Sequence, residues 1–257
     1  MNVTIVLPTY NEAENIEAFL NAVYRVINEI NDFNINTLIV DDNSPDGTAG
    51  IVKRLQQSND KIHLLENNTR GLGNAYKAGF KYAIANLNPD ILVEMDSDFS
   101  HSPEKLKELL PPINEGYDFV IGSRYIKGGS IPQNWALIRK LNSKYGNVFA
   151  RFIAGLKQVR DCTSGFRAIK VEILNKIDLD NLDVNGYAFQ MNILYECVNV
   201  GAKTLEIPID FIDRVKGKSK LNIKDVKEFM INSFKLFFRR LFKNKNWKIF
   251  IYFYWFL

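Results

Sequence analysis

The sequence predicts an α/β fold with a mostly parallel central sheet, and two patterns in its first half carry this prediction. Short apolar runs rich in β-branched residues alternate with longer segments, as strands do when helical crossovers join them. The runs also end in clusters of Pro, Asp, Asn and Gly, which form turns that lead into helices. With 257 residues, 46% of them hydrophobic, the chain is not disordered and can bury the core of one such domain.

The strands are assigned from these apolar runs, and the helices from the segments that follow them. The predicted strands lie, in chain order, at residues 3–7, 37–40, 62–65, 91–95 and 119–122. Pro8 ends the first strand, and an acidic turn at residues 41–47 ends the second. Gly71 and Gly73 lack the third glycine of a dinucleotide-binding fingerprint. We therefore interpret them as a tight turn that opens a helix extending to about Ala85.

Two carboxylates, Asp96 and Asp98, follow the predicted strand at residues 91–95. The carboxyl ends of strands are where α/β sheets bind ligands. Because Mg²⁺ usually takes one or two carboxylates together with substrate phosphates and water, the pair predicts a divalent-metal site. Taken alone, this motif is more typical of a turn, or of a cap by Asp98 or Ser100 on a helix that Pro103 would open.

Seven motifs, in this order, extend across the chain from Val3 to about Leu221. They lie at residues 7–12, 40–47, 95–101, 122–125, 161–168, 186–190 and 211–221. With these motifs the chain resembles glycosyltransferase family 2, and within it most closely the dolichyl- or polyprenyl-phosphate mannose synthases. The resemblance implies a GT-A fold, a Rossmann-like nucleotide-diphospho-sugar transferase domain, which we assign to residues 1–222.

The resemblance also implies a donor site for GDP-mannose at the strand ends. The implied donor-site residues are Pro8, Tyr10, Glu12, Asp42, Asp96, Arg214 and Lys220. Carboxylates suit the hydroxyl and N–H groups of a nucleoside, and an aromatic ring can stack on the base. The family likeness further assigns Asp96 and Asp98 to Mg²⁺ or Mn²⁺, whereas Ser100 replaces a glutamine that some relatives use as another ligand. An ordinary helix start is the alternative for residues 10–12.

On the acceptor side, the resemblance assigns Arg124 and Arg139 to the phosphate of a dolichyl or polyprenyl phosphate. It assigns residues 127–135 to a loop that covers this site. An arginine fork can hold two phosphate oxygens at once, which orients a phosphate better than lysine does. By position alone, an arginine after a strand is more often a solvated charge beside a carboxylate.

The expected reaction needs no general base, because a phosphate monoester is already anionic at neutral pH. His63 and His101 are the only histidines, and neither belongs to a triad-like motif. We therefore expect positioning and charge stabilisation to dominate catalysis, with Asp96, Asp98, Arg124 and Arg139 as the catalytic set. Displacement in one step would invert the sugar carbon and give a β-linked lipid-phosphate mannose.

Residues 229–257 contain six Lys or Arg and no Asp or Glu, so we expect them to face an anionic surface. Apolar residues recur at helical spacing from Val226 to Leu241, which predicts an amphipathic basic and aromatic helix. An apolar end follows at residues 247–257, shorter than the roughly 20 residues that span a bilayer. Residues 223–257 are thus predicted to be a membrane-associating tail. Packing of its phenylalanine stripe on the catalytic domain is the alternative.

The cellular setting is inferred from cysteine usage and from the tail. Cys162 and Cys197 have no metal-ligand spacing, which suggests reduced thiols in the cytosol, and we expect no signal peptide before Val3. The predicted location is the cytoplasmic face of a membrane, peripheral or tail-anchored. The expected partners are GDP-mannose, the lipid phosphate, the membrane surface and a membrane partner subunit, with no nucleic acid.

Two other functions fit many of the same motifs. A polyprenyl-phosphate glucosyltransferase that uses UDP-glucose would share the fold and most of the site. A catalytically silent GT-A scaffold or regulatory subunit would also keep the fold. The intact set of Asp96, Asp98, Arg124 and Arg139 argues against a silent protein.

Overall fold

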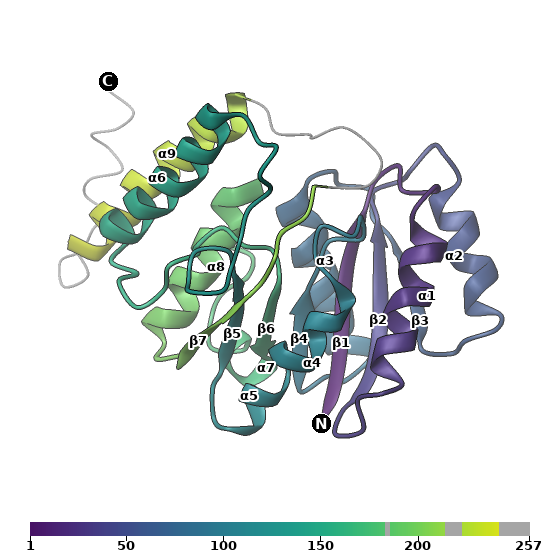
Figure 1. Ribbon diagram of the computed structural model, residues 1–257. Coiled ribbons are helices and arrows are strands. Elements are labelled where there is room, and N and C mark those ends of the chain that lie inside the picture. The colour runs from purple at the N-terminus through teal and green to yellow at the C-terminus, as the bar shows by residue number, and fades with distance from the viewer. Residues whose placement is uncertain (183–185, 214–222, 242–257) are drawn as a thin grey trace.

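The computed structural model describes residues 1–182, 186–213 and 223–241, and its strands form one seven-stranded sheet (Figure 1). The strands are β1 (Asn2–Thr9), β2 (Asn34–Asp41), β3 (Ile62–Glu66), β4 (Ile91–Glu94), β5 (Phe119–Ser123), β6 (Arg167–Lys170) and β7 (Thr204–Pro208). Their order in the sheet is β3-β2-β1-β4-β6-β5-β7. β6 is antiparallel to both neighbours, and the other pairings are parallel. The predicted α/β class with a mostly parallel sheet is confirmed.

Helices cover both faces of this sheet (Figure 1). They are α1 (Ile16–Ile27), α2 (Thr48–Gln56), α3 (Leu72–Asn86), the 3₁₀ turn η1 (Pro103–Lys105), α4 (Leu106–Leu109), α5 (Pro111–Asn114), α6 (Leu137–Ala154), α7 (Val171–Leu174), α8 (Gly186–Asn199) and α9 (Ile223–Leu241). One buried cluster joins the sheet to α1, α2, α4 and α5. A second cluster joins the other face to α3, α6, α8 and α9.

The strands contribute to both clusters because successive side chains of a strand point to opposite faces. In β1, Ile5 and Leu7 belong to the cluster beneath α1, while Val6 belongs to the cluster beneath α3. Strands buried on both faces favour apolar residues at successive positions, which explains why most residues of these strands are apolar. Gly71 precedes α3 with φ of 123°, which confirms the predicted turn into a helix.

Helix α9 lies beside α6 and α8 and packs against both (Figure 1). Phe229 and Leu236 are buried in the cluster that α9 shares with α8. Asn192 of α8 and Asn232 of α9 exchange two side-chain hydrogen bonds of 3.1 Å. This helix therefore packs on the neighbouring helices through one face, which buries Phe229 of the phenylalanine stripe but leaves Phe234 and Phe238 exposed. The membrane association of the tail stays a prediction. The apolar end at residues 247–257 lies outside the described residues.

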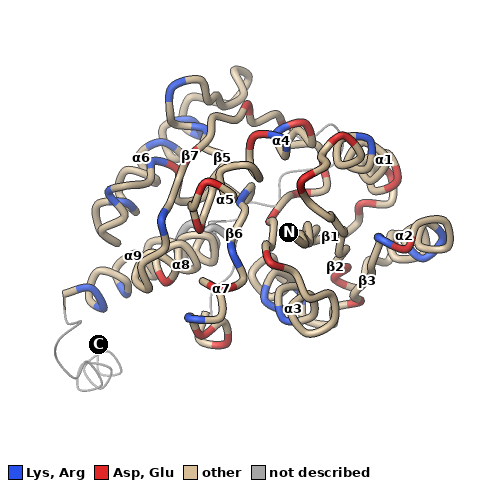
Figure 2. The backbone as a smooth tube through the Cα atoms, turned by 90° about the horizontal axis from the view of Figure 1, so that it is seen from below, with Lys and Arg blue, Asp and Glu red and all other residues tan. Residues whose placement is uncertain are grey.

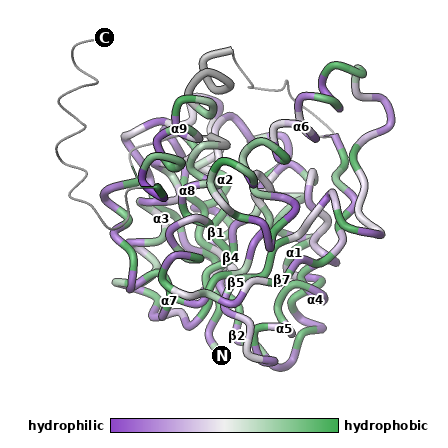
Figure 3. The backbone as a smooth tube through the Cα atoms, turned by 90° about the vertical axis from the view of Figure 1, so that its left-hand side faces the viewer, coloured by the Kyte–Doolittle hydropathy of each residue, from purple (hydrophilic) through white to green (hydrophobic). Residues whose placement is uncertain are grey.

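The opposite faces of α6 and α9 are exposed and combine apolar with basic residues. Figure 2 shows Lys and Arg along both helices, and Figure 3 shows hydrophobic segments interspersed among hydrophilic ones. Within the described parts of the chain, no helix has the length and hydropathy needed to cross a membrane.

Candidate active site

The carboxyl ends of β1, β2 and β4 meet at one edge of the sheet because these three strands are parallel neighbours. Thr9 pairs with Asp41 at the ends of β1 and β2, and the Asp42 N–H donates to the Thr9 carbonyl at 3.0 Å. Of the sequence-predicted residues, Tyr10 and Asp42 directly follow β1 and β2, and Asp96 is the second residue after β4. The structure thus brings the three acidic and aromatic turns of the sequence to the same edge.

The two adjacent aspartates at the end of β2, Asp41 and Asp42, have different surroundings. Asp41 is buried, and its carboxylate accepts hydrogen bonds from the Thr9 hydroxyl at 3.0 Å and the Ser44 hydroxyl at 2.6 Å. Asp42 accepts from the Asn67 amide at 2.7 Å and the Gly71 N–H at 3.0 Å. Burial raises the pKa of Asp42 in spite of these hydrogen bonds. Asp41 therefore holds the turn together, while Asp42 ties the end of β2 to the turn that opens α3.

The first turn contains the other predicted nucleotide-binding residues. The guanidinium of Arg70 lies 4.4 Å from the ring centroid of Tyr10, which joins this turn to the segment before α3. The Glu12 carboxylate accepts from the Asn15 amide at 2.9 Å, and the Glu12 N–H donates to the Thr48 hydroxyl at 3.0 Å. Pro8 does not end the first strand, as the sequence predicted, because β1 continues to Thr9 and Pro8 is paired with Val40 of β2. Their assignment to a nucleotide pocket stays a prediction.

Asp96 and Asp98 lie in the turn after β4, with unequal exposure. The Asp96 side chain is 35% exposed, whereas Asp98 is buried and accepts the Ser100 N–H at 2.9 Å. The Asp98 bond is a local turn, but the residue that precedes η1 is Ser102, so neither Asp98 nor Ser100 caps that helix. The local turn therefore does not exclude a metal site at the two carboxylates.

His101 supports this turn from behind. It is buried, it stacks on Phe166 with ring centroids 5.3 Å apart, and its Nδ1 accepts the Asp96 N–H at 3.3 Å. Burial lowers the pKa of His101 to about 4. The ring is therefore neutral near pH 7, and its 3.8 Å approach to the Asp96 carboxylate is not an ion pair.

The donor set of this turn fits a hard divalent cation. Among the described residues no group of three or more His, Cys, Asp or Glu gathers to form a complete protein cage. Two carboxylates are nevertheless what Mg²⁺ commonly takes when substrate phosphates and water complete its shell. Asp96 and Asp98 therefore match an ion that is held jointly with a diphosphate rather than by protein alone.

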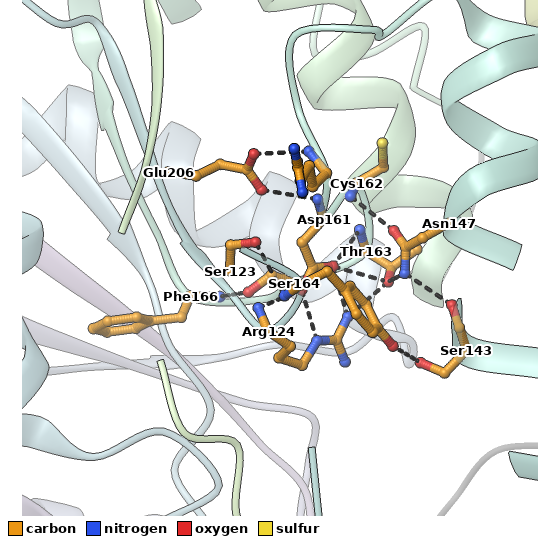
Figure 4. A network of polar contacts seen from close by, with 12 residues as sticks. Ser123, Arg124, Ser143, Asn147, Asp161, Cys162, Thr163, Ser164, Phe166 and Glu206 are labelled. Carbon is orange, nitrogen blue, oxygen red and sulfur yellow. Dashed lines mark hydrogen bonds and ion pairs between the residues drawn. The ribbon is translucent and has the colours of Figure 1, made fainter. Parts of the chain in front are cut away.

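Arg124 follows β5 and is held rigidly by Asp161 (Figure 4). Its Nε and Nη2 each donate to one Asp161 oxygen at 2.7 Å, and its backbone N–H donates to the same carboxylate at 3.0 Å. Thr163 accepts a further bond from Nη2 at 2.8 Å. Burial would raise the pKa of Asp161, but the Arg124 charge and hydrogen bonds outweigh it and lower the pKa. Arg124 is thus a fixed, charged group at the end of β5.

Arg139, the other predicted phosphate-binding arginine, lies in the first turn of α6. Its guanidinium stacks 3.8 Å from the centroid of Trp135, and its Nη1 lies 3.5 Å from an Asp213 oxygen. Phe211 connects the two arginines, because its ring contacts both Trp135 and the Arg124 guanidinium. Phe211 also contacts His101, at 5.5 Å between centroids. Arg124, Arg139 and the Asp96 turn thus belong to one continuous group of contacts.

The positions of the remaining predicted residues are not described. Arg214 and Lys220, assigned to a loop over the diphosphate, lie outside the described residues. Their role stays a prediction, as do the acceptor roles of Arg124 and Arg139.

Sequence reasoning missed a buried polar cluster directly behind Asp96. Glu94 and Arg167 are fully buried, and Arg167 Nε lies 3.8 Å from a Glu94 oxygen. Within the described chain, neither Glu94 oxygen has a hydrogen-bond partner, nor do the side-chain atoms of Gln190 or the Tyr76 hydroxyl. Burial raises the pKa of Glu94 to about 7, although Arg167 opposes the shift. The available signal was Glu94 at the end of an apolar run, since a carboxylate in a buried strand requires a partner.

Arg167 also ties this cluster to the Arg124 site. Its Nη1 donates to the Gln190 carbonyl at 2.6 Å, and its Nη2 donates to the Cys162 carbonyl at 2.8 Å. Cys162 adjoins Asp161, so a single buried cation supports the segment that fixes Arg124. The charges of the buried pair Arg124 and Asp161 balance, and Glu94, with its pKa raised to about 7, offsets part of the Arg167 charge at neutral pH. Asp96 and Asp98 remain as the local excess of negative charge, which favours a cation.

Comparison with known proteins agrees with this geometry. The model of the family described as "Glycosyl transferase family 2" matches residues 4–178. A polyprenol monophosphomannose synthase of Mycolicibacterium smegmatis is 38% identical over 88% of this chain and 83% of its own length. An undecaprenyl-phosphate mannosyltransferase of Micrococcus luteus is 37% identical over 90% and 92%. A dolichol-phosphate mannosyltransferase of Pyrococcus furiosus is 33% identical over 92% of this chain and 64% of its own length.

Solved structures with lower sequence identity share the fold. Mannosyl-3-phosphoglycerate synthase of Rubrobacter xylanophilus superposes with a TM-score of 0.66 at 20% identity, over 94% of this chain and 74% of that one. Glucosyl-3-phosphoglycerate synthase of Mycobacterium tuberculosis, in complex with Mn²⁺ and UDP-glucose, gives 0.61 at 17% identity, over 89% and 74%. The predicted GT-A fold is confirmed. The chain belongs to glycosyl transferase family 2 and is a glycosyltransferase.

Proposed function

We propose that this enzyme transfers mannose from GDP-mannose to a polyprenyl or dolichyl phosphate, with inversion at the sugar carbon. The observation that carries the proposal is the set of relatives, 33–38% identical over most of the chain, whose names give polyprenyl-type phosphates and mannose. The site supports it, because Arg124 and Arg139 offer two cations to a phosphate. The turns after the parallel strands β1, β2 and β4, which we call the donor turns, would bind the nucleotide sugar.

The mechanism relies on positioning. A phosphate oxygen of the acceptor attacks the sugar carbon without prior loss of a proton, so no side chain has to act as base. Arg124 is held by three hydrogen bonds to Asp161, and it orients the phosphate with little loss of side-chain entropy. Arg139 supplies the second cation from α6. His101 stays neutral and fixes the Asp96 backbone rather than moving a proton.

Departure of the nucleoside diphosphate leaves negative charge at the ends of β1, β2 and β4. Asp96 and Asp98 would hold Mg²⁺ or Mn²⁺, which neutralises this charge when bound. The fold neighbour of Mycobacterium tuberculosis, solved with Mn²⁺ and UDP-glucose, supports a divalent ion in this architecture. Attack and departure on opposite sides of one carbon would give the β-linked lipid product.

We further propose that the enzyme works at the cytoplasmic surface of a membrane. The exposed sides of α6 and α9 carry large apolar side chains at helical spacing, which are Ile138, Leu141, Tyr145, Val148 and Phe152 on α6 and Met230, Ile231, Phe234, Phe238 and Leu241 on α9. On α9 the side buried against the protein is mixed, because Asn232 and Ser233 are buried together with Phe229 and Leu236. An apolar face turned outward in this way suits the interface of a bilayer.

The basic residues on and around α6 and α9 support binding to a membrane that contains anionic lipids. Residues 119–160, which include α6, contain eight Lys or Arg and no Asp or Glu. On α9, Lys235 and Arg240 are exposed beside the apolar residues. Each basic residue near an anionic membrane adds attraction of about 1 kcal/mol. The apolar stripe and the basic flanks together are typical of a helix that lies in the headgroup layer.

The test is transfer of labelled sugar by the purified protein, with Mg²⁺ or Mn²⁺, into lipid extracted by organic solvent. GDP-mannose and UDP-glucose are compared as donors, and polyprenyl phosphate in vesicles is compared with 3-phosphoglycerate as acceptor. We expect mannolipid from GDP-mannose, lost on addition of EDTA. Glucolipid made from UDP-glucose would mean that the donor is UDP-glucose. A water-soluble sugar product made from 3-phosphoglycerate would mean that the acceptor is not a lipid phosphate. Absence of product from every pair would contradict both the proposed donor and the proposed acceptor.

A further inference from the structure

The segment before α6 is fastened to the segment after β7 by several contacts. The Ser130 N–H donates to the Ile209 carbonyl at 3.0 Å, and the Phe211 N–H donates to the Ser130 carbonyl at 3.1 Å. The Ser130 hydroxyl donates to Asp210 at 2.6 Å. Asp213, three residues further on, reaches the same segment. The predicted acceptor loop at residues 127–135 is thereby joined to the chain that leads toward Arg214.

Asp213 makes two unequal contacts through one carboxylate oxygen. The Trp135 indole N–H donates to Oδ1 at 2.7 Å, which is a good hydrogen bond. Arg139 Nη1 lies 3.5 Å from the same oxygen, and the two charged side chains are 42% and 37% exposed. Asp213 is therefore held firmly by Trp135, while it holds Arg139 only loosely.

The two arginines of the proposed acceptor site consequently differ. Arg124 is buried and bound by both oxygens of Asp161 at 2.7 Å, so that pair is permanent. Arg139 is half exposed and makes one long contact to Asp213, a type of ion pair that contributes little and exchanges easily. An incoming phosphate would compete with Asp213 for Arg139, whereas it would not displace Asp161 from Arg124.

We propose that Asp213 is a positioning residue that competes with the acceptor phosphate for Arg139 and thereby weakens phosphate binding enough for the product to leave. The inference rests on the proposed function, since it takes Arg139 to bind the lipid phosphate. Before binding, Asp213 keeps Arg139 over Trp135. Because Trp135 holds the carboxylate in place, Asp213 stays close to Arg139 and re-forms its contact with Arg139 after transfer.

The charge change of the reaction gives this competition a direction. The acceptor is a phosphate monoester that carries nearly two negative charges near neutral pH. Transfer forms a bond from one of its oxygens to the sugar carbon, and the sugar's bond to the nucleoside diphosphate breaks. The lipid product is then a phosphate diester with one negative charge. A monoanion binds an arginine less strongly than a dianion does, so Asp213 regains Arg139 more readily from product than from substrate.

Asp213→Asn tests this competition with little structural change. The amide oxygen of asparagine still accepts the Trp135 N–H, but the negative charge beside Arg139 is lost. Asp210→Asn is the matched control, because it makes the same change of charge on the same segment. It retains an acceptor for the Ser130 hydroxyl, and the described contacts of Asp210 include no cation. Thermal unfolding of both variants verifies that the fold is kept.

We expect Asp213→Asn to lower the KM for polyprenyl phosphate about two- to fivefold, the range that an exposed ion pair supports. The inhibition constant of the mannosylated lipid should fall by a similar factor, while kcat does not rise. Asp210→Asn should change neither constant. A gain of affinity for substrate and product is a result that loss of a merely structural contact does not produce.

The contrary outcomes are distinct. A KM that rises in Asp213→Asn would mean that the carboxylate holds Arg139 in place for the phosphate, and an unchanged KM would mean that there is no competition. Either result overturns the inference. Arg139→Ala, measured in parallel, should raise the KM for the lipid phosphate. If it does not, or if the unaltered enzyme transfers no sugar to lipid, the proposed acceptor site itself is wrong and the inference falls with it.

Discussion

Two buried groups behind Asp96 have pKa values displaced in opposite directions. Burial lowers the pKa of His101 from 6.5 to about 4 and raises that of Glu94 from 4.5 to about 7. Between pH 4.5 and 6.5 the folded chain therefore keeps a proton on Glu94 that the unfolded chain releases. In the same pH window His101 is neutral in the folded chain, whereas the unfolded chain binds a proton at this residue. In this window the two effects on the free energy of unfolding oppose each other.

Single substitutions should separate these effects. In His101→Gln only the Glu94 shift remains, so stability should rise as the pH falls from 7 to 5. In Glu94→Gln only the His101 shift remains, so stability should fall over the same interval. Each change is at most about 3 kcal/mol. Urea unfolding at several pH values in EDTA measures both slopes, and equal slopes in the two variants would contradict the assignment.

The same residues show which parts of the site can be predicted from sequence. Asp96, Asp98 and Arg124 lie within three residues of the ends of predicted strands, and a strand end implies a position at one edge of the sheet. The pairing of Glu94 with Arg167 could not be predicted, because it joins residues 73 positions apart through antiparallel strand pairing. For the same reason, the attachment of Arg139 to Asp213 became visible only in three dimensions.

At the scale of elements, two helical glycines offer a test of packing. A Cβ on Gly79 of α3 would lie 2.6 Å from Val6 and 2.9 Å from Val40, because this helix approaches the sheet closely. A Cβ on Gly50 of α2 would meet nothing within 4 Å. Gly79 therefore permits contact between helix and sheet, whereas Gly50 only adds backbone freedom to the unfolded chain.

Alanine should consequently have opposite effects at the two positions. Gly79→Ala should destabilise the protein by roughly 1–3 kcal/mol through overpacking. Gly50→Ala should stabilise it by about 0.5–1 kcal/mol, through helix propensity and a less flexible unfolded chain. Chemical denaturation of both variants gives the two values. If Gly79→Ala were neutral, α3 would be able to move away from the sheet without cost.

Element predictions succeeded where local pattern decides the structure and failed where neighbours do. The five predicted strands are all present, because runs of β-branched residues bounded by turn residues are a local signal. β6 and β7 were missed because neither is an uninterrupted apolar run. β6 begins with Arg167 and ends with Lys170, and β7 contains Glu206 and ends with Pro208. The apolar face of α9 was predicted from its spacing, but which side faces the protein depends on α6 and α8.

At the scale of the whole molecule, the proposed acceptor site and the proposed membrane surface share one helix. Arg139 lies in the first turn of α6, between exposed Ile138 and the exposed apolar residues that follow along the helix. A lipid phosphate could thus reach Arg139 without leaving the headgroup layer. The turns after β1, β2 and β4 are joined to the first turn of α6 through His101, Phe211 and Trp135, whereas the rest of α6 lies further from them (Figure 1). A soluble nucleotide sugar would therefore bind beside the start of α6 without entering the membrane.

This arrangement predicts that the apolar face matters only for an acceptor embedded in a bilayer. Phe152 and Leu241, one from each helix, are 70% and 58% exposed, so replacing both with serine should leave stability within about 0.5 kcal/mol. Binding to anionic vesicles should weaken at least about tenfold, since burying one such side chain contributes ~1.5–3 kcal/mol. Flotation or sedimentation of the vesicles measures this loss.

The kinetic comparison decides whether that surface delivers the acceptor. In the Phe152→Ser, Leu241→Ser variant, we expect the KM for a long polyprenyl phosphate in vesicles to rise. The KM for a short, water-soluble isoprenyl phosphate should stay the same, because Arg124 and Arg139 are intact. Val200→Ser replaces an apolar residue exposed elsewhere, after α8, and should affect neither acceptor. A KM that rises equally for both acceptors would place the effect inside the active site, and one that rises for neither would mean that the lipid reaches Arg139 by another route.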